Sequence, residues 1–206
     1  MFAQVIDGSV VSHPKGNKGI IIDDVQYPST IYTLWTEAER NAIGIYTVEI
    51  DNTNLKDETY YINTNQTIAY DSSADKVTAS YGTATAKILN DENAVDDNGD
   101  PILDDNGDQV VNYGLKTYYK NIFNAQAKGL LEKSDWYVIK ATDVESYSVP
   151  SNITTYRTQV RAKVNSMETE IDNCSSVEEL ETLLEYTTDD NGVQSRPLGD
   201  FPDEVV

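Results

Sequence analysis

LKTYYKNIFNAQAKGLL, residues 115–131, is the stretch at which the spacing of apolar residues changes to that of a helix. Apolar side chains recur there at intervals of three and four residues, which places them on one face of an α-helix. The members of this stripe are Leu115, Tyr118, Tyr119, Ile122, Phe123, Leu130 and Leu131. Gly129 lowers the helix propensity near the end of the stretch. The pattern predicts a helix that begins at Leu115.

Two further helices are predicted downstream. Pro150 marks the start of a second apolar stripe, made of Ile153, Tyr156, Val160, Val164, Met167 and Ile171. Ser175 and Glu178 have the spacing of a capping box, which opens a short helix through Leu184. Between the two long stripes, Ser134-Asp135 resembles a helix cap and precedes a dense apolar cluster, residues 136–139. We expect Trp136 to be a core residue that joins the two long helices, so residues 114–186 should form a helical hairpin or a three-helix unit.

Upstream of the helices, residues 1–89 have strand-like patterns. Apolar residues flank Asp7-Gly8, a dipeptide that favours a tight turn, so Phe2 to Val11 should form a hairpin. Thr36 and Glu39 predict a short capped helix. From Ile45 to Tyr81, short β-rich segments separated by turn residues predict an antiparallel meander with one buried face. The predicted fold class is α+β, with a β-rich N-terminal part and a helical C-terminal part.

Residues 90–113 form an acidic insert between these two parts. Eight acidic residues lie between Asp91 and Asp108 without a lysine or arginine, and the unit Asp-Asp-Asn-Gly-Asp occurs twice, at 96–100 and 104–108. Such a charge block resists burial. We expect a β-hairpin or extended arm in which Ile102-Leu103 pairs with Val110-Val111 and which contacts a neighbouring subunit. The polar, proline-containing tail, residues 187–206, should be extended and make few contacts within its own chain.

Composition narrows the class of partner. The net charge of −20 and the pI near 4.1 exclude nucleic acid and anionic membranes as binding partners, because both attract positive patches. The single cysteine, Cys174, cannot form an internal disulfide, and no apolar run is long enough to span a bilayer. The residues after Met1 lack the pattern of a secretory leader, so we expect synthesis in the cytoplasm.

No catalytic or metal-binding pattern stands out. With Gly99 or Gly107 as the sixth position of a calcium loop, the first position would be Ala94 or Ile102, and neither supplies an oxygen ligand. The acidic repeats therefore predict turns, although loose calcium binding at the surface stays open. His13, the only histidine, lies in a glycine-rich loop without a nucleophile motif. We predict a protein that is not an enzyme and has no cofactor.

One longer pattern consists of a leucine pair, Asp-Trp, a basic residue four positions after the tryptophan, a proline, Tyr-Arg and a second arginine. These residues are here Leu130-Leu131, Asp135-Trp136, Lys140, Pro150, Tyr156-Arg157 and Arg161. The pattern resembles a segment of tailed-bacteriophage tail proteins, including tail-fibre and tail-fibre-assembly proteins. Lys140 departs from the pattern, which often has arginine there. The segments around Tyr27-Pro28, Trp35 and Glu39-Arg40 and around Pro101–Asp104 are also similar.

The resemblance implies a virion or assembly role and no catalysis. A structural component of the baseplate, tail tip or fibre attachment, present in several symmetric copies, is the leading hypothesis. A tail-fibre assembly chaperone absent from the mature particle is the alternative, and a carbohydrate-binding tip is a third possibility. The partners would be other phage tail, baseplate or fibre proteins. The candidate interface residues are Trp35, Ile102, Leu103, Arg157 and Arg161; the two arginines share a helix face and could instead pair with the chain's own acids.

Overall fold

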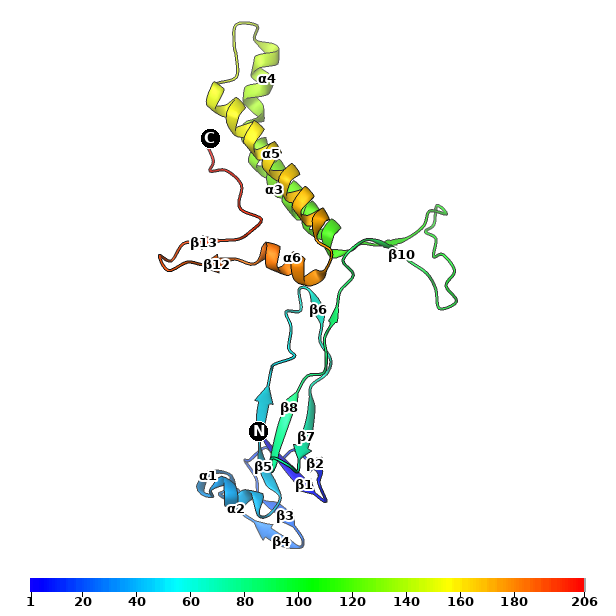
Figure 1. Ribbon diagram of the computed structural model, residues 1–206, viewed down its shortest axis with the longest axis vertical. Coiled ribbons are helices and arrows are strands. Elements are labelled where there is room, and N and C mark those ends of the chain that lie inside the picture. The colour runs from blue at the N-terminus through cyan, green and yellow to red at the C-terminus, as the bar shows by residue number, and fades with distance from the viewer. Residues whose placement is uncertain (206) are drawn as a thin grey trace. The chain divides into compact units, whose positions relative to one another are not determined.

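The computed structural model describes residues 1–205, and the chain divides into two compact units, one from Met1 to Thr85 and a second from Ala86 onward. Strands dominate the first unit and helices the second (Figure 1). The predicted α+β class, with strands before helices, is therefore confirmed.

The first unit is built on a five-stranded sheet. β1 (Phe2–Ile6) and β2 (Ser9–Ser12) form the predicted hairpin, and both turn residues, Asp7 and Gly8, have positive φ angles. β5 (Ile45–Asp51), β7 (Thr67–Asp71) and β8 (Lys76–Ser80) complete the sheet in the order β2-β1-β5-β8-β7.

The predicted antiparallel meander is wrong: β5 and β8 run parallel, and the segment at Tyr61–Ile62 lies outside the five-stranded sheet. β8 lies between β5 and β7 instead of at the edge. Its Val77 and Ala79 are fully buried, whereas β7 has no buried residue and occupies the edge position. The strand that can bury its alternate side chains thus lies next to β5, although β7 comes before it in the chain.

Two apolar clusters stabilise the first unit. The larger one lies on one face of the sheet, and its buried members are Ala3, Tyr46, Val48, Val77 and Ala79. The second joins Ile45 to α1 (Ile31–Leu34) and to the hairpin of β3 (Ile20–Ile22) and β4 (Val25–Tyr27).

The smaller elements of this unit follow local rules. α2 (Glu37–Asn41) has the predicted capping box: the Thr36 side chain accepts from the N–H of Glu39, and the Glu39 carboxylate accepts from the N–H of Thr36. β6 (Tyr61–Ile62) and β9 (Thr85–Ala86) form a separate two-stranded ribbon.

The second unit is built on two long helices, α3 (Leu115–Glu132) and α5 (Ser151–Asn173), which lie side by side (Figure 1). α3 passes through Gly129 without a break, and α5 begins directly after Pro150 as predicted. The α5 stripe is buried as expected, and Arg157 is buried with it. α6 (Val177–Leu184) is capped by Ser176 and Glu179, one residue later than predicted.

Trp136 does not belong to the core, so that prediction is wrong. It lies in α4 (Asp135–Asp143), which has no buried residue, and 51% of its surface is exposed. Four consecutive apolar residues, 136–139, point to all sides of a helix and cannot form one buried stripe. Ser134 precedes α4 but makes no capping bond; its hydroxyl donates to the Leu131 carbonyl instead.

The prediction that the tail makes few contacts is also wrong. β12 (Thr187–Thr188) and β13 (Gln194–Ser195) form a hairpin, and Leu198 is fully buried. The Leu198 N–H donates to the Leu183 carbonyl (3.0 Å), and its own carbonyl accepts from the Lys163 ammonium (2.6 Å). One buried leucine with both backbone groups bonded is enough to hold a polar segment on the helices.

Candidate functional site

The acidic insert has a short β-stem and is tied to the start of α3. β10 (Glu92–Asn93) pairs with β11 (Val111–Asn112). At the base, the Asp91 carboxylate accepts from the N–H of Gly114 (2.8 Å) and from the hydroxyl of Thr117 (2.9 Å). These bonds fix the orientation in which the stem leaves the helix.

Each acidic repeat forms a turn, as predicted. The Asp96 carboxylate accepts from the backbone N–H groups of Asn98 (2.8 Å) and Asp100 (3.0 Å). Asp104 does the same with Asn106 and Asp108, both at 2.9 Å. The N–H groups of Asp100 and Asp108, followed by those of Asn98 and Asn106, lower the pKa of Asp96 and Asp104. These two carboxylates therefore stabilise the backbone of their own turns.

Beyond the stem, the acidic insert closes into a ring instead of continuing as the predicted two-stranded hairpin. Ala94, Ile102 and Val110 are spaced eight residues apart. The Ala94 N–H donates to Val110, the Val110 N–H to Ile102 and the Ile102 N–H to Ala94, at 2.8–3.0 Å. The Gln109 side-chain amide lies within 2.8–3.1 Å of all three carbonyl oxygens. The ring forms within a single chain, so it does not require a neighbouring subunit.

The surface of the acidic insert combines free carboxylates with aliphatic side chains. Among residues 1–205, no hydrogen bond or ion pair reaches five of its carboxylates, one in the stem (Glu92) and four in the ring: those of Asp97, Asp100, Asp105 and Asp108. Val95, Ile102 and Leu103 are 53%, 42% and 56% exposed. The candidate interface residues Ile102 and Leu103 are thus accessible to a partner.

A second accessible surface surrounds α4. We define the α4 surface as the exposed apolar residues Trp136, Val138, Ile139 and Val144. The Lys140 ammonium lies 5.7 Å from the Trp136 ring centre and 4.3 Å from that of Tyr147. Exposed apolar groups that gather around one short helix are typical of an interaction site.

The two candidate arginines have different roles. Arg157 is 8% exposed, and its guanidinium donates to the Leu131 carbonyl (2.8 Å) and the Ser134 hydroxyl (2.7 Å) and pairs with Asp135 (2.8 Å). Arg157 therefore takes the alternative of pairing within its own chain. Arg161 is exposed, and no carboxylate among residues 1–205 pairs with it.

Arg161 lines a groove of about 400 Å³ between α3 and α5, which we call the Arg161 groove. Ala127, Leu131 and Val164 are its apolar lining, and Asn124, Lys128 and Glu132 add polar groups on the α3 side, where Lys128 and Glu132 pair with each other (3.6 Å). This leaves Arg161 as the groove's cation without a carboxylate partner among residues 1–205. Asp135 also lines it and begins α4, so the Arg161 groove adjoins the α4 surface. An exposed guanidinium beside apolar side chains can receive a carboxylate that is carried on an aliphatic segment.

Trp35, the remaining candidate, makes most of its contacts within the first unit. Its ring meets Tyr27 edge to face with centres 5.8 Å apart, and it packs against the Ile31 cluster. Its carbonyl accepts from the Arg40 guanidinium at 2.5 Å. Only part of the ring is open to a partner.

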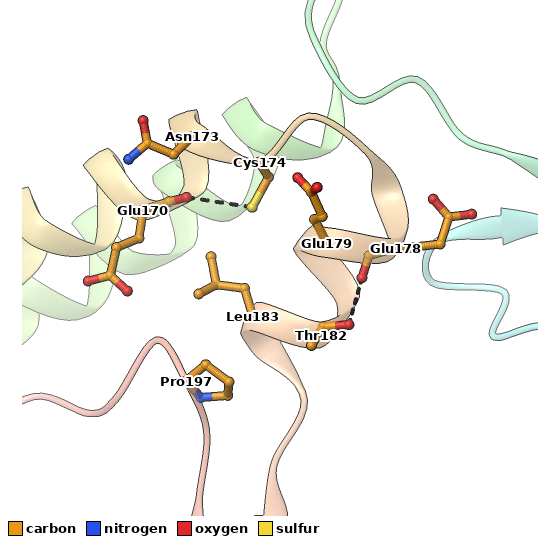
Figure 2. Close-up of a pocket in the computed structure, with 8 residues that line it drawn as sticks. All are labelled: Glu170, Asn173, Cys174, Glu178, Glu179, Thr182, Leu183 and Pro197. Atoms are coloured by element: carbon orange, nitrogen blue, oxygen red, sulfur yellow. Dashed lines mark hydrogen bonds between the residues drawn. The ribbon is translucent and has the colours of Figure 1, made fainter.

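A pocket of about 430 Å³ lies between the end of α5, α6 and Pro197 (Figure 2). Leu183 lies between Cys174 and Pro197, while Glu170, Glu178 and Glu179 surround them. Burial raises the pKa of the Cys174 thiol, which donates to the Glu170 carbonyl (3.5 Å). A nucleophilic cysteine needs a lowered pKa and an adjacent cation, so this thiol is a packing group.

Other searches of the described residues gave no site. No three histidine, cysteine or acidic side chains are grouped to hold a metal ion between residues 1 and 205, and no helix there is long and apolar enough to cross a membrane. No family model, no curated protein and no solved structure matches the chain.

Proposed function

We propose that this chain is a non-enzymatic structural component of a tailed-phage tail, at the baseplate, tail tip or fibre attachment. The observation that carries the proposal is the exposure of Trp136 and Ile139, at 51% and 60%, within the segment that resembles phage tail proteins. Large apolar side chains on an exposed helix favour a protein interface, where aromatic residues are enriched.

The acidic insert supports the same function. Its ring is closed by backbone hydrogen bonds and is also bonded by the Gln109 side-chain amide, so it presents Val95, Ile102 and Leu103 on an ordered framework. A rigid framework reduces the conformational entropy that is lost on binding. A solvated loop without a binding role would not need three exposed aliphatic side chains among its acids.

The test is quantitative mass spectrometry of purified particles from the phage that encodes the chain. We expect the chain at a fixed, stoichiometric copy number. Its absence from particles that nevertheless need it for fibre attachment would support the alternative, a tail-fibre assembly chaperone, for which the same apolar surface would hold an unassembled partner. Assembly that is normal without the chain would contradict both.

A matched pair of variants connects this test to the α4 surface. Trp136→Ala combined with Ile139→Ala should reduce incorporation into particles severalfold, since interface aromatic residues carry much of the binding energy. Leu34→Ala combined with Ile62→Ala removes residues that are 77% and 61% exposed in the first unit and should leave incorporation unchanged. Equal incorporation of the two double variants would show that the α4 surface is not needed for assembly.

A further inference from the structure

Charge is distributed very unevenly along this acidic chain. Residues 115–165, which contain α3 and α4, have eight lysines and arginines and four acids, a net charge of +4. The rest of the chain has seven basic and 31 acidic residues, a net charge of −24. The acidic insert alone accounts for eight of these acids. Residues 115–165 therefore form a net positive segment within an acidic chain and attract anionic groups.

Most cations of this segment already have intramolecular partners. Lys120 pairs with Asp172, Lys133 with Glu204 and Arg157 with Asp135. Arg161 is the exception that lines a groove, since its guanidinium makes only a long contact (3.4 Å) with the Arg157 carbonyl. The Arg161 guanidinium lies beside apolar groove residues and next to the α4 surface. A partner that carries both carboxylates and aliphatic side chains would complement this arrangement.

The acidic insert has this combination. Asp97, Asp100, Asp105 and Asp108 are free, and Val95, Ile102 and Leu103 are exposed between them. We propose that the acidic insert of one copy of this chain docks into the Arg161 groove and onto the α4 surface of a second copy. This inference rests on the proposed function, because it names the partner of the same surfaces.

Two different patches of one chain meet in such a contact, so it is heterologous. Repetition of the contact produces a closed ring or a filament, depending on the rotation between copies. Beyond the β10–β11 stem the insert has only the 17 residues 94–110, fewer than the roughly 20–30 residues that each partner contributes to a standard stable interface. A single contact should therefore be weak and salt-sensitive, and several contacts in a closed ring would strengthen one another.

Self-association of the full chain tests the proposal. In sedimentation velocity at low salt, the weight-average sedimentation coefficient should rise with protein concentration, and this rise should diminish at about 0.5 M salt because of screening. The insert variant replaces Asp97, Asp100, Asp105 and Asp108 by asparagine. None of these side chains accepts a backbone bond, so the loops should stay intact. Its dissociation constant should increase roughly tenfold or more.

Two further variants complete the design. Arg161→Glu reverses the charge in the groove and should abolish self-association. The control replaces Asp7, Asp23, Asp24 and Asp190 by asparagine; it changes net charge by the same amount outside the proposed contact and should associate at least as well as the original chain. Circular dichroism of each variant checks that it is folded.

Mixing gives the sharpest discrimination. The insert variant keeps an intact groove and the Arg161→Glu variant keeps an intact insert, so a mixture of the two should form a one-to-one complex at a concentration at which neither variant associates alone. Failure of the folded variants to form that complex, unaltered self-association of the insert variant, or a monomeric chain at all concentrations would overturn the proposal. Each of these results leaves the particle stoichiometry unchanged, so the proposed function is judged separately.

Discussion

α4 and α5 follow one another in the chain and apolar residues are denser in α4, yet α5 buries seven side chains and α4 buries none. The difference is one of spacing. In α5 the apolar residues recur every three or four positions and meet α3 along one face. In α4 they occupy four successive positions and point in all directions. Density of apolar residues thus indicates an attractive surface, and only periodicity indicates a buried one.

The largest effect should come from truncating the α5 stripe. Ile171 is fully buried, so Ile171→Ala should lower the free energy of unfolding by about 2–5 kcal/mol. Gln159→Ala, on the exposed side of the same helix, should change it by less than about 0.5 kcal/mol. Urea denaturation monitored by circular dichroism measures both. A small effect of Ile171→Ala would mean that α3 and α5 are not held together by this stripe.

The next largest effect concerns Arg157, which connects α5 to the start of α4. Arg157→Ala leaves the Leu131 carbonyl and the Ser134 hydroxyl without their shared donor and should destabilise the second unit by about 2–3 kcal/mol. Arg161→Ala is the matched control one turn away, and its effect on stability should be below about 0.5 kcal/mol. Similar losses for the two variants would contradict the different roles assigned to the two arginines.

A smaller effect is expected in α4. Trp136→Ala should lower the free energy of unfolding by less than about 1 kcal/mol, because half of the side chain is already exposed and the substitution creates no enclosed cavity. The same urea titration measures it. A loss of 3 kcal/mol or more, which is about the value for a buried tryptophan, would place α4 in the core and remove the basis for the α4 surface.

Much of this fold could be predicted from local rules. Asp7-Gly8 predicts its hairpin, Thr36 and Glu39 predict their capping box, and Pro150 predicts the start of α5, because each signal depends on neighbouring residues alone. The parallel pairing of β5 with β8 could not be predicted in this way, since it depends on which strand buries its side chains best. The docking of the tail combines the buried Leu198 with contacts that no local pattern identifies, such as the Lys133–Glu204 ion pair and Arg196 over the Phe123 ring.

The candidate surfaces were predictable to a different degree. The acidic repeats predict turns and an accessible Ile102 and Leu103, but the ring depends on the side chain of Gln109, which no local pattern identifies. Arg157 and Arg161 share a helix face in sequence, and only the position of the Leu131–Asp135 segment separates a buried arginine from an exposed one. Long-range placement decides which charges are free.

The smallest effect tests how the α4 surface is held together. Lys140 lies against the Trp136 and Tyr147 rings, and such a contact at an exposed site stabilises by only about 0.5–1 kcal/mol. Lys140→Ala should free Tyr147 and increase quenching of Trp136 fluorescence by acrylamide, a neutral quencher whose access does not depend on the charge of Lys140. Lys140→Arg supplies the residue that the resembling phage segment often has, and its planar guanidinium stacks on aromatic rings, so quenching should stay equal or fall. Measurements in a Trp35→Phe background leave Trp136 as the only tryptophan. If Trp136 fluorescence is quenched equally in the alanine and arginine variants, Lys140 does not order these rings, and the α4 surface is a set of independent side chains.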